Sequence, residues 1–311
     1  MRRLARPLLA SISLVALAAC QGEPDAATPL TAPEPAGEAW LAGVDLPAYL
    51  DCAREQGATL LQAHRAGDRA GAAENSLRAI EASLADGAVF AEIDVAQTED
   101  GVLVLMHDDT LDRTTTGEGE LDDMTYAELS GVELVDLDGA PTGEPIPTLE
   151  AVLAYLDGRG IAQVDLKDIS FDQVADALEA GDAVDRAVVI TYSMEDALAL
   201  HERLPGVMMS VGMRSAEDLQ TLRDEGVDLT RVTAWLGLGT GNPALDAALA
   251  DAGIETSYGD FRAERQGTID YTVMAENGAE VISVDDVPAA ADALDARETA
   301  RTVLAACEAA R

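Results

Sequence analysis

Short apolar runs alternate with amphipathic stretches along the chain from Thr59 onward. Short runs rich in Val, Ile and Leu are typical of buried strands, and the stretches between them repeat apolar residues with helical spacing. Eight main strands are predicted, at 59–64, 89–95, 102–107, 161–166, 187–191, 207–211, 254–258 and 280–284. A short additional strand is predicted near 231–235. Helices are predicted at 75–86, 148–157, 171–180, 194–203, 215–225, 243–252, 270–277 and 287–296.

This alternation predicts an α/β fold. Eight strands with interleaved helices favour a TIM (β/α)8 barrel over an open doubly wound sheet. No G-x-G-x-x-G or P-loop motif follows a predicted strand, which argues against a nucleotide-binding fold. The chain has 311 residues, of which 48% are hydrophobic, so it can build the large core that one barrel needs.

Two segments interrupt the alternation of strands and helices. The stretch 94–107 is too short for a helical crossover and contains the turn-like sequence Thr98-Glu99-Asp100-Gly101, so a hairpin or an extended return is expected there. The Gly- and Asp-rich segment 108–147 is an insertion after the third predicted strand, with one short helix expected at 125–129. We expect it to lie over the mouth of the barrel, because loops at that end carry function in this fold.

The N-terminus has the pattern of an export signal. Arginines precede an apolar run, Leu8–Ala19, that is too short to span a bilayer, so residues 1–19 are predicted to be a signal peptide. The run ends Leu17-Ala18-Ala19-Cys20, which resembles the lipobox of bacterial lipoproteins and predicts a lipid on Cys20. The alternative is secretion after cleavage at Ala18. Lipidation would place the protein in the bacterial cell envelope, with 20–44 as lipidated N-terminus and flexible linker and 45–311 as the folded domain.

Two further cysteines lie near the two ends of the predicted domain. Cys52 precedes the first strand, and Cys307 lies in a helix at the end of the chain. An exported protein can form disulfides, and a closed barrel brings its ends together. A Cys52–Cys307 bond is therefore one expectation, and two free buried thiols are the other.

The formal net charge of −38 restricts the partners of the protein. So acidic a surface repels nucleic acids and anionic membranes, which leaves the lipid anchor as the expected membrane contact. An anionic substrate would have to meet a strong local positive field. A divalent metal ion would supply that field.

Candidate catalytic residues follow the first predicted strands. The chain has three histidines, and two of them, His64 and His107, come directly after strand-like runs, with Arg65 beside the first. Glu92 and Asp94 are two residues apart on another strand, so they point to the same side. Two imidazoles, two carboxylates and an arginine are suited to metal-assisted acid–base chemistry on an anion.

The strand predicted at 161–166 adds a further charged pair. Asp165 and Lys167 have the same spacing with opposite charges, and Lys167 is the only lysine in the chain. Its position at the end of a barrel strand, beside a carboxylate, favours a function in the site.

These residues belong to a series of motifs that occur in order along the chain. They are His64-Arg65, Glu74-Asn75-Ser76, Glu92-Ile93-Asp94, His107-Asp108-Asp109-Thr110-Leu111-Asp112-Arg113-Thr114-Thr115, Pro147-Thr148-Leu149 and Asp165-Leu166-Lys167. The series resembles the glycerophosphodiester phosphodiesterase family. The likeness is good over roughly 59–168 and looser afterwards, and the run that begins at His107 is its most specific part.

The resemblance implies a TIM barrel that uses one divalent cation, Mg²⁺ or Ca²⁺, to hydrolyse glycerophosphodiesters to glycerol 3-phosphate and an alcohol through a cyclic phosphate. It implies roles for nine residues: Glu92, Asp94 and Asp165 as metal ligands, His64 and His107 as the acid–base pair, Arg65 and Lys167 as phosphate ligands, and Glu74 and Asn75 as supports of the first loop. Two positions depart from the family pattern. Ala66 stands where the family usually has glycine, and Asp165 where it usually has glutamate.

Two other functions remain open from the sequence. A phospholipid lyase like the sphingomyelinase D enzymes would use much of the same constellation, and a non-catalytic lipoprotein could bind phosphodiesters for uptake. Three aromatic residues at or near strand ends, Tyr192, Trp235 and Tyr258, could surround a choline or acyl group or could fill the core.

Overall fold

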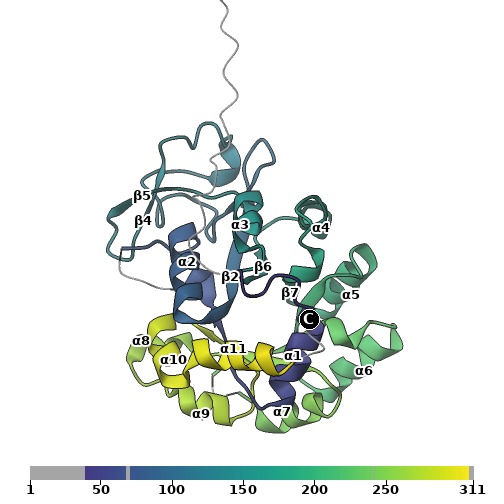
Figure 1. Ribbon diagram of the computed structural model, residues 1–311. Coiled ribbons are helices and arrows are strands. Elements are labelled where there is room, and N and C mark those ends of the chain that lie inside the picture. The colour runs from purple at the N-terminus through teal and green to yellow at the C-terminus, as the bar shows by residue number, and fades with distance from the viewer. Residues whose placement is uncertain (1–38, 68–70, 240, 308–311) are drawn as a thin grey trace, which may run out of the picture. The chain divides into compact units, whose positions relative to one another are not determined.

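The structure is a computed structural model, and it describes residues 39–67, 71–239 and 241–307 (Figure 1). The predicted signal peptide, Cys20 and most of the predicted linker lie outside these residues. Within the described ranges, no helix has both the length and the apolar character needed to cross a membrane.

Eight parallel strands form a closed barrel, as predicted. In order around the barrel they are β1 (Leu60–Ala63), β11 (Val281–Val284), β10 (Glu255–Gly259), β9 (Val232–Leu238), β8 (Met208–Gly212), β7 (Ala187–Thr191), β6 (Ile161–Leu166) and β2 (Ala88–Gln97). The first strand pairs with both β11 and β2, and this double pairing closes the sheet.

The identity of one barrel strand was predicted wrongly. The run at 102–107 contains only the short strand β3 (Leu103–Leu105), which pairs antiparallel with β2 and lies outside the barrel. The run near 231–235, expected to be a minor strand, is the barrel strand β9. The tight turn at 98–101 forces the hairpin geometry on β3, because parallel neighbours need a longer crossover. An apolar run alone does not reveal its pairing partner.

Within the described residues, the eight predicted helices are present with shifted ends. The helix expected at the end of the chain is also present, although it ends one residue before Cys307, and two further helices were not predicted. The helices are α1 (Leu46–Glu55), α2 (Leu77–Asp86), α3 (Leu149–Leu156), α4 (Phe171–Ala180), α5 (Met194–Arg203), α6 (Ala216–Asp224), α7 (Pro243–Ala250), α8 (Phe261–Gln266), α9 (Tyr271–Glu276), α10 (Val287–Leu294) and α11 (Ala296–Ala306). Several helices begin after a capping residue whose side chain accepts a hydrogen bond from a backbone N–H of the first turn. Ser76 caps α2 in this way, and Ser170 caps α4.

The side chains inside the barrel change character along the strands. Near the amino ends they are apolar and packed in one cluster: Leu60, Phe90, Ile161, Val188, Met208 and Val281. Two residues further along, the strands present polar groups, among them Gln62, Glu92, Gln163, Ser210 and Ser283. Residues two apart in a strand point to the same side, so both sets of side chains lie inside the barrel. The interior is therefore apolar at the amino ends of the strands and polar toward their carboxyl ends.

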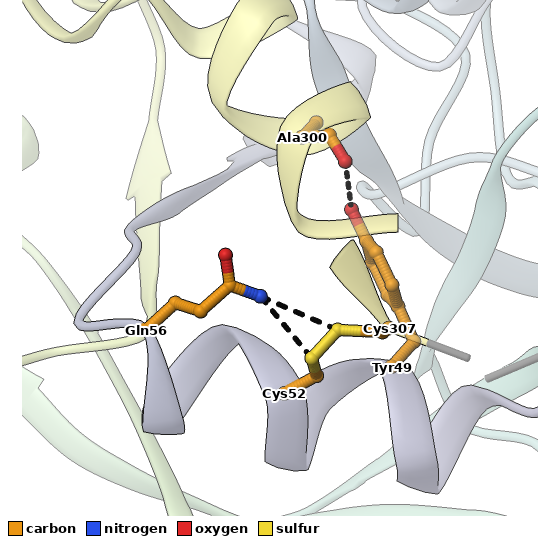
Figure 2. The surroundings of a disulfide bond; sticks show 5 residues. All are labelled: Tyr49, Cys52, Gln56, Ala300 and Cys307. Atoms are coloured by element: carbon orange, nitrogen blue, oxygen red, sulfur yellow. Dashed lines mark hydrogen bonds between the residues drawn. A yellow bond between two sulfur atoms is a disulfide. The ribbon is translucent and has the colours of Figure 1, made fainter. Parts of the chain in front are cut away.

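Helix α1 covers the apolar end of the barrel and is tied to the end of the chain. Tyr49 and Leu50 of α1 pack in the same apolar cluster as Leu60. A disulfide joins Cys52 to Cys307, with the two Cα atoms 6.1 Å apart (Figure 2). The amide Nε2 of Gln56 donates hydrogen bonds to both sulfurs, at 3.1 and 3.3 Å. The structure thus contains the first of the two alternatives that the sequence left open for this pair.

The insertion 108–147 folds on its own small core beside the barrel. It contains β4 (Glu133–Val135) and β5 (Pro141–Pro145), and Leu111, Leu121 and Leu134 form part of a separate apolar cluster. The helix expected at 125–129 is wrong, because these residues form turns. Hydrogen bonds from Arg78 of α2 to Thr142 and Glu144 hold the insertion against that helix. No residue of 108–147 lines the main cavity of the barrel.

Candidate active site

Three carboxylates meet inside the barrel at the carboxyl ends of two neighbouring strands. Glu92 and Asp94 lie on β2 and Asp165 lies on β6, where Asp94 and Asp165 are register partners. All three are buried, and one oxygen of each lies within 4.8 Å of the others. In the part of the chain that the structure describes, this is the one group of acidic, histidine or cysteine side chains with the spacing of a metal site.

The charges of this carboxylate cluster are only partly balanced. The Nζ atom of Lys167 lies 2.6 Å from Oδ2 of Asp165 and 3.0 Å from Oδ1 of Asp94. Burial, reinforced by the charge of Asp94, raises the pKa of Glu92 to about 8. The other oxygen of Asp165, Oδ1, is buried and has no hydrogen-bond partner among the described residues. A hard divalent cation such as Mg²⁺ or Ca²⁺ fits this set, because it takes carboxylate oxygens and would offset their repulsion.

The loop after β1 holds two of the carboxylates by short hydrogen bonds. The amide of Asn75 donates to Oδ2 of Asp94 at 2.7 Å, and the backbone N–H of Asp94 donates back to the Asn75 amide oxygen at 3.0 Å. The backbone N–H of Arg65 donates to Glu92 at 2.7 Å. Arg65 and Ala66 have positive φ angles of 50° and 69°, in the left-handed region that favours glycine. Ala66 stands at the position where the family usually has that glycine.

His64 is held on two sides. Its Nδ1 atom lies 2.7 Å from Oδ1 of Asp285, and its ring stacks on Phe261 with the centroids 4.1 Å apart. Burial acts to lower the pKa of His64, but the hydrogen bond to Asp285 and the charges of Glu92 and Asp285 outweigh it, so the net shift is upward. The sequence alone predicts no function for Asp285. The available signal was its position directly after the strand Val281–Val284, which matches the position of His64 after β1.

His107 has a similar carboxylate behind its ring. Its Nδ1 atom lies 2.7 Å from Oδ1 of Asp108. Arg113 donates to both oxygens of Asp108, at 2.5 and 2.8 Å, and these bonds hold the pKa of Asp108 well below its usual range. In both histidines Nδ1 is therefore occupied, which leaves Nε2 as the nitrogen for chemistry.

Arg113 also connects the two loops that carry the histidines. Its guanidinium donates two further hydrogen bonds to Glu74, at 2.8 and 2.9 Å. Glu74 in turn accepts one from Arg65 at 3.3 Å. His107 is thus linked to the carboxylate cluster through Asp108, Arg113, Glu74 and Arg65. Arg113 belongs to the motif that begins at His107, but the sequence alone predicts no function for it.

A cavity of about 690 Å³ opens beside the carboxylate cluster. His64, Glu92 and Asp165 line it, and much of the remaining wall is apolar or aromatic: Ile190, Tyr192, Met194, Met213, Trp235, Leu238 and Phe261. The hydroxyl of Tyr192 donates to Asp165 at 2.6 Å. Of the three aromatic residues named from the sequence, Tyr192 and Trp235 lie in this wall. Tyr258 does not, because it is buried in a core cluster and donates to the Met274 carbonyl at 2.6 Å.

The chain resembles proteins of one family in sequence and in structure. A sequence model described as the glycerophosphoryl diester phosphodiesterase family matches residues 64–202. A glycerophosphodiester phosphodiesterase of Caldanaerobacter subterraneus subsp. tengcongensis is 40% identical over 99 residues, which are 32% of this chain and 40% of that protein. One from Bacillus altitudinis is 31% identical over 162 residues, or 49% of this chain and 66% of its own length.

The structural likeness extends over more of the chain. The crystal structure of a glycerophosphoryl diester phosphodiesterase from Parabacteroides distasonis has a TM-score of 0.70 and 27% identity, and the match covers 76% of this chain and 86% of that one. The sequence matches are shorter, since the chain spans only about two fifths of the length of the first curated relatives.

Proposed function

Because this chain belongs to the glycerophosphoryl diester phosphodiesterase family, we propose that it hydrolyses glycerophosphodiesters to glycerol 3-phosphate and an alcohol with the help of one divalent cation. The observation that supports this function most directly is the buried cluster of Glu92, Asp94 and Asp165 beside a histidine whose Nδ1 is held by a carboxylate. A protein that only binds phosphodiesters has no need of such a histidine.

Glu92, Asp94 and Asp165 would hold the cation, Mg²⁺ or Ca²⁺. A bound cation of this kind withdraws charge from the phosphoryl oxygens and so favours attack at phosphorus. The Oδ1 atom of Asp165 supports the assignment, because it has no hydrogen-bond partner in the described part of the chain and buried carboxylate oxygens are rarely left without one.

Among the described residues, Arg65 and Lys167 each carry a positive charge next to the carboxylate cluster, and we assign them to the phosphate oxygens. Arginine offers a planar fork that can hold two oxygens of one phosphate. Glu74 orients Arg65 by its hydrogen bond, and Asn75 orients Asp94. Both residues thus act through their neighbours.

His64 and His107 are assigned to proton transfer, with either of them as the first base. One neutral imidazole takes the proton of the glycerol hydroxyl next to the phosphate, and that oxygen attacks phosphorus. The other, protonated, imidazole gives its proton to the leaving alcohol oxygen, and a cyclic phosphate forms. The two then exchange roles: the neutral one activates water, and the protonated one returns its proton to the ring oxygen. Each such transfer is typically worth ~10²–10⁴ in rate.

We also propose that the enzyme works in the bacterial cell envelope, anchored through a lipid on Cys20. The sequence Leu17-Ala18-Ala19-Cys20 supports the anchor, and the disulfide between Cys52 and Cys307 suits an oxidising compartment. Metabolic labelling with palmitate tests the proposal. Label in the wild type but not in Cys20→Ala is expected, and an unlabelled wild type would refute it.

The deciding experiment measures turnover of glycerophosphocholine by the domain 45–311, with and without EDTA. Turnover should require Mg²⁺ or Ca²⁺ and should fall by at least ~10²-fold in His64→Ala and in His107→Ala. His201→Ala is the matched control, because the third histidine lies on α5 away from the site and its loss should change nothing. Metal-independent turnover, or full activity in both variants, would overturn the mechanism. A cyclic phosphate as the final product would show a lyase.

A further inference from the structure

Each of the three carboxylates in the cluster has one oxygen that already accepts a hydrogen bond from the protein. Oε2 of Glu92 accepts one from the backbone N–H of Arg65 at 2.7 Å. Oδ2 of Asp94 accepts one from the side-chain amide of Asn75, also at 2.7 Å. The third carboxylate, Asp165, is held more firmly than the other two.

A single oxygen of Asp165 accepts two short hydrogen bonds. Its Oδ2 atom lies 2.6 Å from Nζ of Lys167 and 2.6 Å from the hydroxyl oxygen of Tyr192. These two donors occupy both lone pairs of that oxygen. The opposite oxygen, Oδ1, is buried and has no hydrogen-bond partner among the described residues. Asp165 can therefore offer a cation one of its oxygens but not both.

Tyr192 reaches Asp165 from the neighbouring strand. It comes directly after β7, which pairs in parallel with β6, the strand that carries Asp165. Tyr192 is 70% exposed, so its ring contributes little to the core. Packing therefore does not account for a tyrosine at this position, whereas the hydrogen bond from its hydroxyl to a buried carboxylate does.

The number of oxygens that each carboxylate can offer distinguishes the two candidate cations. Ca²⁺ takes roughly six to eight oxygens and often both oxygens of one carboxylate, whereas the smaller Mg²⁺ takes about six in a stricter geometry. A cluster in which Asp165 can give only Oδ1 suits Mg²⁺ better. Aspartate is also shorter than the glutamate that the family usually has here, with fewer torsions, so the bonds to Oδ2 fix the direction of Oδ1.

We propose that Tyr192 is a positioning residue of the metal site: its hydroxyl confines Asp165 to one metal-facing oxygen and so makes the site prefer Mg²⁺ to Ca²⁺. This inference rests on the proposed function, because it takes the carboxylate cluster as the place of the cation. Lys167 is assigned to a phosphate oxygen, so Tyr192 is the donor that remains on Oδ2 when substrate binds. Replacing a residue that hydrogen-bonds a metal ligand typically weakens metal binding by ~10–100-fold.

Titration calorimetry of the whole protein with MgCl₂ and with CaCl₂, without substrate, tests the inference. The wild type should bind Mg²⁺ more tightly than Ca²⁺. Tyr192→Phe removes only an exposed residue's hydroxyl, and it should lower the Mg²⁺ affinity at least ~10-fold and the Ca²⁺ affinity by less than about threefold. Tyr126→Phe is the matched control, because that hydroxyl donates to the Ile146 carbonyl in the insertion, and both affinities should equal those of the wild type.

Three results would overturn the inference. They are binding of neither ion, tighter binding of Ca²⁺ than of Mg²⁺ by the wild type, and a ratio of the two affinities that Tyr192→Phe leaves unchanged. Thermal melting of the metal-free variant shows whether it is folded, so that a loss of affinity is not a loss of structure.

Turnover of glycerophosphocholine in Mg²⁺, measured separately, distinguishes this inference from the proposed function. If the ions bind as expected and Tyr192→Phe loses the preference, but the wild type does not hydrolyse the compound, the function fails and the inference stands. If the wild type hydrolyses it and Tyr192→Phe keeps the full preference for Mg²⁺, the function stands and Tyr192 has no part in the choice of metal.

Discussion

His64 and Asp285 are 221 positions apart in the chain, yet their side chains meet with Nδ1 and Oδ1 2.7 Å apart. The barrel brings them together, because β1 pairs with β11 and Ala63 lies opposite Val284, so the next residue of each strand is His64 and Asp285. A carboxylate on Nδ1 fixes the tautomer and the orientation of an imidazole. The closure of the sheet therefore supplies the partner of one of the two histidines assigned to catalysis.

Replacing Asp285 by asparagine should lower kcat by ~10²-fold and leave KM nearly unchanged, because His64 loses the anion that orients it. Steady-state kinetics on glycerophosphocholine give both constants. Asp286→Asn is the matched control: Asp286 caps α10 through its side chain, and asparagine caps helices equally well. A kcat within twofold of wild type in Asp285→Asn would show that the carboxylate is dispensable.

Replacing Arg113 should weaken catalysis without touching the cavity. Alanine at this position leaves Asp108 and Glu74 without their shared cation, so both histidine-bearing loops lose support, and kcat/KM should fall at least ~10-fold. Lysine keeps the positive charge but cannot make the four hydrogen bonds of the planar guanidinium, so kcat/KM of Arg113→Lys should lie between those of wild type and Arg113→Ala. Arg203→Ala is the control, because Arg203 also binds several carboxylates but lies on α5. Equal activity of the two alanine variants would contradict the prediction.

A divalent cation should raise the melting temperature of the domain. A ligand that binds only the folded state stabilises it by about 2.7 kcal/mol at a hundred times its Kd, which corresponds to a shift of several degrees for a domain of this size. Asp165→Asn should abolish most of the shift seen with Mg²⁺ or Ca²⁺. Asp168→Asn should keep it, because Asp168 is exposed and asparagine tolerates its φ of 52°. Scanning calorimetry with and without the cations makes the comparison, and an undiminished shift in Asp165→Asn would remove this residue from the metal site.

Removing the disulfide should lower stability and spare activity. The bond between Cys52 and Cys307 closes a loop of 255 positions, for which chain entropy alone predicts a contribution on the order of 5 kcal/mol. Denaturant unfolding of Cys52→Ser/Cys307→Ser, and of wild type with and without dithiothreitol, measures the loss. Because the bond lies at the apolar end of the barrel, away from the carboxylate cluster, kcat should stay within about twofold. A large fall in kcat of the folded variant would be inconsistent with this arrangement.

Stability should also depend on a buried carboxyl group outside the active site. Burial raises the pKa of Glu280 to about 7, although its carboxylate accepts a hydrogen bond from the Thr256 N–H at 2.7 Å. The folded state therefore holds the proton more tightly than the unfolded chain, where the pKa is about 4.3. The stabilising effect of the proton is complete below about pH 4 and is lost as the pH rises through 7.

Glu280→Gln removes this titration and keeps the acceptor for Thr256. Its free energy of unfolding relative to wild type should rise by roughly 1–3 kcal/mol between pH 5 and pH 8. Urea unfolding at several pH values gives the difference. Glu276→Gln, at an exposed position of α9, should show a difference that does not vary with pH. If the Glu280→Gln difference is equally flat, Glu280 is already ionised at low pH in the folded state.

Local patterns in the sequence determined most of the elements and half of the site. Helical spacing and cap residues such as Ser170 act within a few positions, so the helices between the strands were predictable. Glu92 and Asp94 share a face because every strand alternates its side chains, and this holds whatever the strand pairs with. The carboxylate cluster and both histidines could therefore be found without coordinates.

Tertiary structure decided everything that depends on which strand lies beside which. The run 102–107 lies outside the barrel and β9 is one of its strands, although an apolar run can form a strand in either position. Tertiary structure set Asp285 against His64 and left Oε1 of Gln62 without a hydrogen-bond partner among the residues that the structure describes. These relations join residues far apart in the chain, and pairing between strands distant in sequence is fixed only when the whole sheet closes.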